Sequence, residues 1–117
     1  MPLIQIRRKL GVISHHEMLA LKDELPAFVA GALSCKEGGI LQPKDIMLEI
    51  DDMGAYDVNC KDIHVRVCAH DYPSRRANLD DIRKAISKQV LKCLPQGASW
   101  YVWVLLVPTS YGSDTEG

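Results

Sequence analysis

The sequence repeats one hydrophobic pattern twice, and this repeat restricts the possible folds more than any other feature. Residues 2–52 and 62–107 each begin with a short apolar stretch, continue through apolar residues at helical spacing, and end with another short apolar stretch. A connection long enough to hold a helix favours parallel pairing of the two strands that it joins. The pattern therefore predicts an α+β fold, in which two βαβ units form one four-stranded mixed sheet with two helices on one face.

In the first half, PLIQIRR at 2–8 alternates as a strand does, and DIMLEID at 45–51 has the composition of a second strand. Between them, Ser14 precedes a helical pattern, and Glu17 stands at the capping-box spacing from it. We expect Pro26 to kink this helix or to split it into two segments, because proline lacks a backbone N–H donor.

In the second half, IHVRVCAH at 63–70 alternates strictly between apolar residues and bulkier or polar ones. We expect YPSRRAN at 72–78 to form a loop that leads to a helix beginning near Asn78, which is a good N-cap residue. The last strand, WYVWVLLV at 100–107, is apolar on both faces, and residues 108–117 are expected to form a tail.

One layer of helices leaves the other face of the sheet uncovered. That face is expected to present polar side chains together with apolar residues of the last strand, such as Tyr101, Trp103 and Leu105. An apolar strand on an uncovered sheet face predicts a partner subunit. We therefore expect an oligomer.

Composition excludes several classes of function. At 117 residues with a net charge of −1, the chain is expected to be a single domain over 1–117, and it has no basic excess of the kind that binds nucleic acid or anionic membranes. No apolar run reaches the roughly 18 residues of a membrane span, and we expect a cytoplasmic protein with reduced cysteines. Neither His15 and His16 nor the pair Cys68 and His70 has the pattern of a zinc site, so no metal or organic cofactor is expected.

Proline directly after the initiator methionine offers unusual chemistry. If Met1 is removed, Pro2 carries a secondary amine whose reference pKa is near ~7.7–8. Burial and nearby arginine charge both lower such a pKa, which leaves a neutral base suited to proton abstraction beside a carbonyl. The alternative is that Pro2 only begins a strand, and the sequence does not decide whether Met1 is removed.

The start MPLIQI and the stretch SRRANLDDIRKAI at 74–86, together with the length and the repeat, resemble the tautomerase superfamily. This group includes 4-oxalocrotonate tautomerase, 5-carboxymethyl-2-hydroxymuconate isomerase and macrophage migration inhibitory factor. The resemblance implies a homotrimer in which Pro2 moves a proton on a small unsaturated keto or enol acid while arginines hold its carboxylate. Within the second stretch Arg76 matches the family pattern best, and Arg75 is its neighbour.

Other residues fit the implied site less closely. In the shortest family members an arginine follows the glycine after the first strand, but here Val12 follows Gly11, and Arg8 lies earlier. Tyr101 and Tyr111 are candidates to donate a hydrogen bond to an enolate oxygen, although Tyr101 also suits a subunit interface. Arg66 is a candidate for the substrate carboxylate or for an ion pair with a carboxylate such as Glu49.

Two other functions remain open at this stage. The chain could be an oligomer that keeps the fold without the chemistry, or an α+β module that binds a small ligand. Within the family, the substrate and the choice among tautomerisation, hydration of a halogenated acrylate and decarboxylation are also undetermined.

Overall fold

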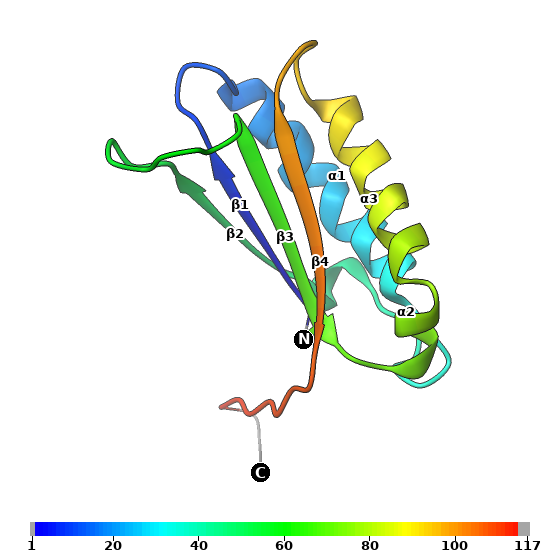
Figure 1. Ribbon diagram of the computed structural model, residues 1–117. Helices are drawn as coiled ribbons and strands as arrows, with labels where there is room; N and C mark the ends of the chain where they lie inside the picture. The colour runs from blue at the N-terminus through cyan, green and yellow to red at the C-terminus, as the bar shows by residue number, and fades with distance from the viewer. Residues whose placement is uncertain (1, 115–117) are drawn as a thin grey trace.

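The computed structural model describes residues 2–114, and over this range four strands and two long helices form two layers (Figure 1). The strands are β1 (Leu3–Arg8), β2 (Met47–Asp52), β3 (Ile63–His70) and β4 (Trp100–Val107). The long helices are α1 (His15–Leu33) and α3 (Leu79–Cys93), and a short helix α2 (Pro73–Ala77) and the 3-10 turn η1 (Pro43–Asp45) complete the elements.

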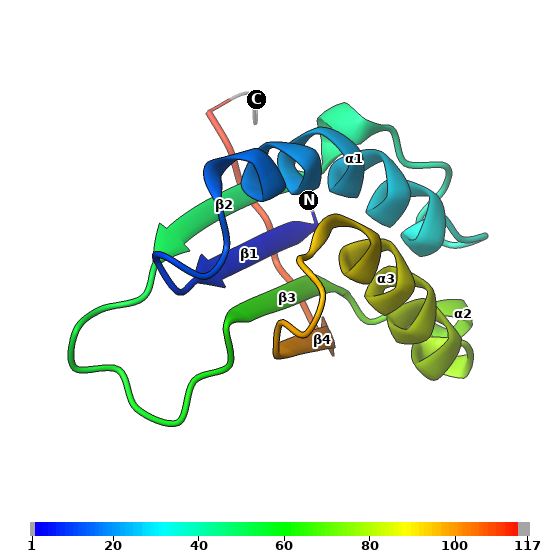
Figure 2. The same cartoon turned by 90° about the horizontal axis from the view of Figure 1, so that it is seen from above.

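The four strands form one mixed sheet in the order β2-β1-β3-β4. β1 pairs in parallel with β2, and β3 pairs in parallel with β4, while the two halves meet through the antiparallel pair β1 and β3. The α+β fold with two βαβ units in one mixed sheet is therefore confirmed. In Figure 2 both long helices lie on the same side of the sheet.

The core lies between the sheet and this helix layer. In β3 the predicted alternation is confirmed, because every second residue from Ile63 is buried and the residues between them are not. Leu21, Leu25 and Val29 of α1 and Ile86 and Val90 of α3 are fully buried against the sheet. The apolar residues at helical spacing thus hold both helices on one face.

Helix α1 begins with the expected capping box. The Ser14 hydroxyl accepts a hydrogen bond from the Glu17 backbone N–H, and the Glu17 carboxylate accepts one from the Ser14 N–H. Of the two alternatives for Pro26, a split of the helix is wrong, because α1 runs from His15 to Leu33 as one element, and the kink stays a prediction. Pro26 denies a hydrogen bond to the carbonyl of Lys22, and Lys22 is exposed, so water can supply the missing donor.

The stretch 72–78 is not the expected loop. It contains α2, a five-residue helix that begins at Pro73 and is followed directly by α3. Asn78 stands at the junction as the N-cap of α3, but its side chain donates to the Ser74 carbonyl of α2 instead of capping α3. Arg75 and Arg76 therefore project from a helix that has a defined orientation.

The strand directions determine which residues meet at each end of the sheet. Because β1 runs antiparallel to β3, Leu3 at the start of β1 pairs with Cys68 near the end of β3. The end of β4 is adjacent, since Val107 pairs with His70. The start of the chain and the last residues of two strands thus lie together at the lower end of the sheet in Figure 1.

No helix among residues 2–114 has both the length and the apolar character needed to cross a bilayer. Cys35, Cys60, Cys68 and Cys93 are free thiols. Burial raises the pKa of Cys93 to about 11, and the neighbouring Glu24 carboxylate acts in the same direction, so this thiol is protonated and structural.

Candidate active site

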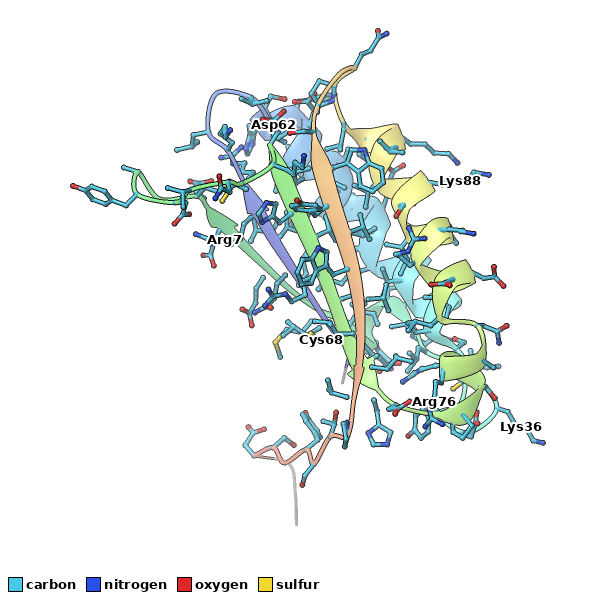
Figure 3. All side chains as sticks on the ribbon, viewed as in Figure 1. Arg7, Lys36, Asp62, Cys68, Arg76 and Lys88 are labelled. Carbon is cyan, nitrogen blue, oxygen red and sulfur yellow. The ribbon has the colours of Figure 1, made fainter. Side chains whose placement is uncertain are left out.

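A cavity of about 490 Å³ opens at the lower end of the sheet. It is bounded by the start of β1, the ends of β3 and β4, helix α2, two loops and the segment after β4. Its lining residues are Pro2, Leu3, Gly38, Leu41, Asp45, Cys68, Ala69, His70, Tyr72, Arg75, Val107, Thr109 and Tyr111. Figure 3 shows Cys68 on the sheet face that the helices leave open.

Pro2 is buried at the wall of this cavity. Its carbonyl oxygen accepts a hydrogen bond of 3.0 Å from the backbone N–H of Met47, which extends the pairing of β1 with β2 by one step. Pro2 needs no backbone donor of its own at this position. The first residue of a strand is a place where proline does not interrupt a sheet.

Arg75 is the cation of the cavity. Its side chain is only 4% exposed, and its Nε donates to the Leu33 carbonyl at 2.9 Å while Nη1 donates to the His70 carbonyl at 3.1 Å. The guanidinium also lies over the Tyr72 ring at 5.0 Å, a cation–π distance. No hydrogen bond joins Nη2 to another residue of the described range 2–114. Nη2 is therefore the part of the fork that remains free to bind an anion.

Arg76 lies elsewhere. Its side chain is exposed, its Nε pairs with the Asp71 carboxylate at 3.0 Å, and it is not among the residues that line the cavity. Figure 3 shows Arg76 at the lower end on the helix side, away from the open sheet face where Cys68 lies. Of the two adjacent arginines, the structure places Arg75 in the cavity and Arg76 outside it.

The loop before η1 holds Tyr72 in place. Glu37 accepts a hydrogen bond from the Ser74 N–H at the start of α2. Hydrogen bonding to the Ser74 side chain is the main cause that lowers the pKa of the Glu37 carboxyl, and the Ser74 backbone acts in the same direction. A Cβ added to Gly38 would lie 2.8 Å from Cε2 of Tyr72, closer than van der Waals contact allows. Gly38 is thus required for the Tyr72 ring to stack on Arg75.

We therefore predict that Gly38→Ala displaces the Tyr72 ring, lowers the free energy of unfolding by about 1–3 kcal/mol and weakens ligand binding in the cavity. Thermal unfolding and isothermal titration with phenylpyruvate measure the two effects. Gly31→Ala is the matched control, because its Cβ would meet open space within α1 and should stabilise the chain slightly. Equal affinities for the two variants would contradict the contact argument.

The segment after β4 closes one side of the cavity. Thr109 donates its backbone N–H to Nδ1 of His70 at 3.1 Å, and its hydroxyl donates to the Val107 carbonyl. Tyr111, two residues further on, lines the cavity although its side chain is largely exposed. Tyr111 is thereby brought to the same cavity as Pro2 and Arg75.

Arg8 and Tyr101 lie at the opposite end of the sheet within the same chain. Arg8 is the last residue of β1, about 20 Å of strand away from Pro2, and it pairs with Asp52 and donates to the Ile13 carbonyl. Tyr101 is near the start of β4, where its ring lies 5.3 Å from that of His64. The pKa of His64 is lowered by burial and by the positive charges of Arg7 and Arg66.

Arg66 occupies the middle of β3 on the open face. It is exposed and lies over the ring of Trp103 at 5.8 Å, and within residues 2–114 it forms no ion pair with Glu49. Arg66 does not line the cavity. A contact of Arg8, Arg66 or Tyr101 with a substrate of this cavity would require a second copy of the chain, and their roles stay predictions.

Four polar or aromatic residues of the cavity were given no catalytic or binding role in the sequence interpretation: Asp45, His70, Tyr72 and Thr109. A signal did exist for His70, which shares a strand face with Cys68 at the end of β3, directly before the arginine stretch. Asp45 was expected at the start of the second strand but is the last residue of η1, which is too short to show a periodic pattern. Thr109 lies in the irregular segment after β4. Among residues 2–114, no three histidine, cysteine or acidic side chains converge as metal ligands would.

No protein-family model matches this sequence, and no curated protein is similar to it in sequence. Solved structures do match. A fused 4-OT, described as a symmetric trimer, superposes with a TM-score of 0.65 at 16% identity, covering 97% of this chain and 93% of that chain. Pt0534, inactivated by 2-oxo-3-pentynoate, matches with a TM-score of 0.65 at 14% identity and the same coverage of 97% and 93%. MIF2 of Leishmania major matches with a TM-score of 0.59 at 15% identity, covering 99% and 95%. The neighbours include members of the tautomerase superfamily, and the likeness establishes that this chain has their fold.

Proposed function

We propose that the protein is a tautomerase that acts on a small 2-keto or enol acid, with Pro2 as the general base. One observation carries the proposal: a single cavity of about 490 Å³ contains both the buried Pro2 and the buried guanidinium of Arg75, whose Nη2 is free to bind. A base and a carboxylate anchor in one cavity are what enolisation of a keto acid needs.

In the proposed reaction the substrate carboxylate binds to Nη2 of Arg75. The guanidinium cannot turn away, because two backbone carbonyls and the Tyr72 ring hold it. In ketonisation the Pro2 nitrogen removes the proton of the enol hydroxyl and gives it to the carbon beside the carbonyl carbon, so that the C=C bond becomes a C=O bond. In the reverse direction it removes the proton from that carbon, and the oxygen receives it. This step requires removal of Met1, since a Met–Pro peptide bond would make the nitrogen an amide without useful basicity. Tyr111 is the candidate to donate a hydrogen bond to the enolate oxygen.

The lining favours a monoacid over a diacid. Among residues 2–114, Arg75 is the one arginine or lysine that lines the cavity, whereas Asp45 contributes a carboxylate. A second substrate carboxylate would meet this negative charge, while an apolar substituent would meet Leu3, Leu41 and Val107. Phenylpyruvate is therefore the better first substrate to assay, and 2-hydroxymuconate serves as the diacid for comparison.

Covalent labelling tests the reactivity of Pro2 directly. A secondary amine adds to the alkyne of 2-oxo-3-pentynoate, forming a C–N bond while the proton moves to carbon, so the adduct gains the whole mass of the reagent. We expect one adduct per chain, located on Pro2 by peptide mapping. Cys68 also lines the cavity and its thiol is free, so Cys68→Ser is the control and should be labelled as the wild type is. Label found only on Cys68 would contradict the proposal.

We further propose that the chain forms a homotrimer through the open face of the sheet. Trp103 on this face is 50% exposed, and Tyr101 and Val107 of the same strand are also exposed in the single chain. An apolar strand exposed to this extent is typical of a surface that a partner covers.

Light scattering should give a mass three times the 13.0 kDa of the chain. Trp103→Asp places a charge in the middle of the face and should shift the protein towards monomer. Tyr56→Asp makes the same kind of change on the loop between β2 and β3, where Tyr56 is fully solvent-accessible, and should leave the mass unchanged. A monomeric wild type would refute the trimer.

A further inference from the structure

The segment that follows β4 lines one side of the cavity through Thr109 and Tyr111. After Val107 the chain leaves the sheet and passes below the start of β1, as Figures 1 and 2 both show. The described part of this segment, residues 108–114, has no helix or strand. Its position therefore depends on side-chain and turn contacts instead of a regular hydrogen-bond ladder.

His70 supplies such a contact. It is the last residue of β3, and its Nδ1 accepts the backbone N–H of Thr109 at 3.1 Å. An imidazole nitrogen that accepts a hydrogen bond carries no proton, so in this arrangement the proton of the neutral ring is on Nε2. The acceptor role of Nδ1 thus selects one tautomer and binds the segment to the sheet.

The same residue also contacts the anion-binding side of the cavity. The His70 ring lies edge-on to the Tyr72 ring at 4.6 Å, and Tyr72 in turn lies under the Arg75 guanidinium. The His70 carbonyl accepts a hydrogen bond from Nη1 of Arg75. His70 is therefore in contact with the segment after β4 on one side and with the support of Arg75 on the other.

We propose that His70 is a positioning residue that holds residues 108–114 against the cavity through Nδ1 and so places Tyr111 at the bound substrate. The expected effect on turnover rests on the proposed tautomerase function. The hydrogen bond that holds residues 108–114 does not depend on that function. Loss of this hydrogen bond opens the cavity beside Thr109 and Tyr111, and substrate binding weakens while the base and the guanidinium stay in place.

Two pairs of variants separate this role from a general effect on folding. In His70→Asn the amide oxygen takes the place of Nδ1 as acceptor, whereas in His70→Gln the polar group lies further out, near the place of Nε2. Thr109→Pro removes the backbone N–H donor itself, whereas Thr109→Ala keeps it and removes only the hydroxyl. The proposal requires His70→Gln to differ from His70→Asn, and Thr109→Pro to differ from Thr109→Ala, in amide exchange and in substrate binding.

Hydrogen exchange gives the first readout and needs no catalytic activity. In His70→Gln we expect the Thr109 amide to exchange about fivefold faster than in the wild type, the factor of a hydrogen bond of ordinary net strength, while His70→Asn stays near the wild-type rate. Thr109→Pro should speed exchange at residues 110–114, and Thr109→Ala should not. Equal rates within both pairs would overturn the proposal.

The second readout is the split between KM and kcat for phenylpyruvate. His70→Gln and Thr109→Pro should raise KM about fivefold or more with a smaller change in kcat, and His70→Asn should restore most of the affinity. If His70→Asn is as impaired as His70→Gln, the acceptor role is refuted. If the wild type turns over no keto acid, the proposed tautomerase function fails, and the exchange rates alone decide whether His70 holds the segment.

Discussion

Replacement of Pro2 by alanine is expected to reduce kcat/KM for phenylpyruvate ketonisation at least about 100-fold, because a positioned general base contributes a factor of roughly 10² to 10⁴. Alanine would leave a primary amine that lacks the ring and its fixed position at the cavity wall. The fold should persist, since Pro2 contributes only its carbonyl to the sheet and alanine keeps that group. The measurement combines steady-state kinetics with circular dichroism, and intact mass establishes that Met1 is absent from both proteins.

A second variant tests the nitrogen without removing the ring. One glycine inserted between Met1 and Pro2 acylates the proline, so its nitrogen becomes an amide with no basicity at neutral pH. This variant should be as inactive as Pro2→Ala while retaining the proline ring. If either variant turned substrate over at the wild-type rate, Pro2 would have no part in the mechanism, and a non-catalytic protein or a different base would remain.

Replacement of Arg75 is expected to have the second largest effect. Arg75→Ala should lower kcat/KM about 100-fold, mainly through a higher KM, because it removes the charged hydrogen-bond donor that faces the cavity. Arg76→Ala is the matched control, since the exposed Arg76 contacts Asp71 and does not line the cavity. We expect less than about a threefold change for that variant. A larger loss in Arg76→Ala than in Arg75→Ala would contradict the assignment.

Arg75→Ala will also affect stability, and this needs a separate measurement. The substitution leaves the Leu33 and His70 carbonyls without their side-chain donor, at about 1–3 kcal/mol for each group that stays buried and unpaired. Arg75→Lys keeps the positive charge but cannot form the same fork. It should be more stable than Arg75→Ala while still binding the keto acid weakly, so kinetic and thermal data on the three arginine variants separate binding from folding.

Hydrophobic periodicity was enough to predict the layers of this protein. The strict alternation of β3, the helical spacing in α1 and α3 and the length of the connections together indicated two βαβ units with one covered sheet face. The prediction failed where segments are short or irregular. Helix α2 has only five residues, too few for a periodic pattern to appear, and its proline and polar residues resemble those of a loop.

The candidate site, like the fold, could be predicted from the sequence only in part. Side-chain chemistry indicated Pro2 as a possible base, and the family resemblance implied an arginine as the carboxylate anchor. The resemblance matched Arg76 best but left either arginine open, whereas the geometry favours Arg75. Neighbouring residues on a helix point about 100° apart, so the orientation of α2 decides which of the two enters the cavity. That orientation follows from the Glu37 contact and from the Tyr72 ring against Gly38, which are contacts between segments distant in the chain.

The direction in which β1 and β3 pair decided which residues share the cavity with Pro2. Local patterns determined that β1 and β3 are strands and which of their faces is buried, but both parallel and antiparallel pairing would satisfy those patterns. The antiparallel pair places the start of β1 beside the end of β3, so Pro2 shares a cavity with Cys68 and His70. A parallel pair would have put Pro2 near His64 instead. Long-range packing selects between the two, because hydrophobic burial depends on the whole sheet and both helices, whereas alternation reports only on one strand at a time.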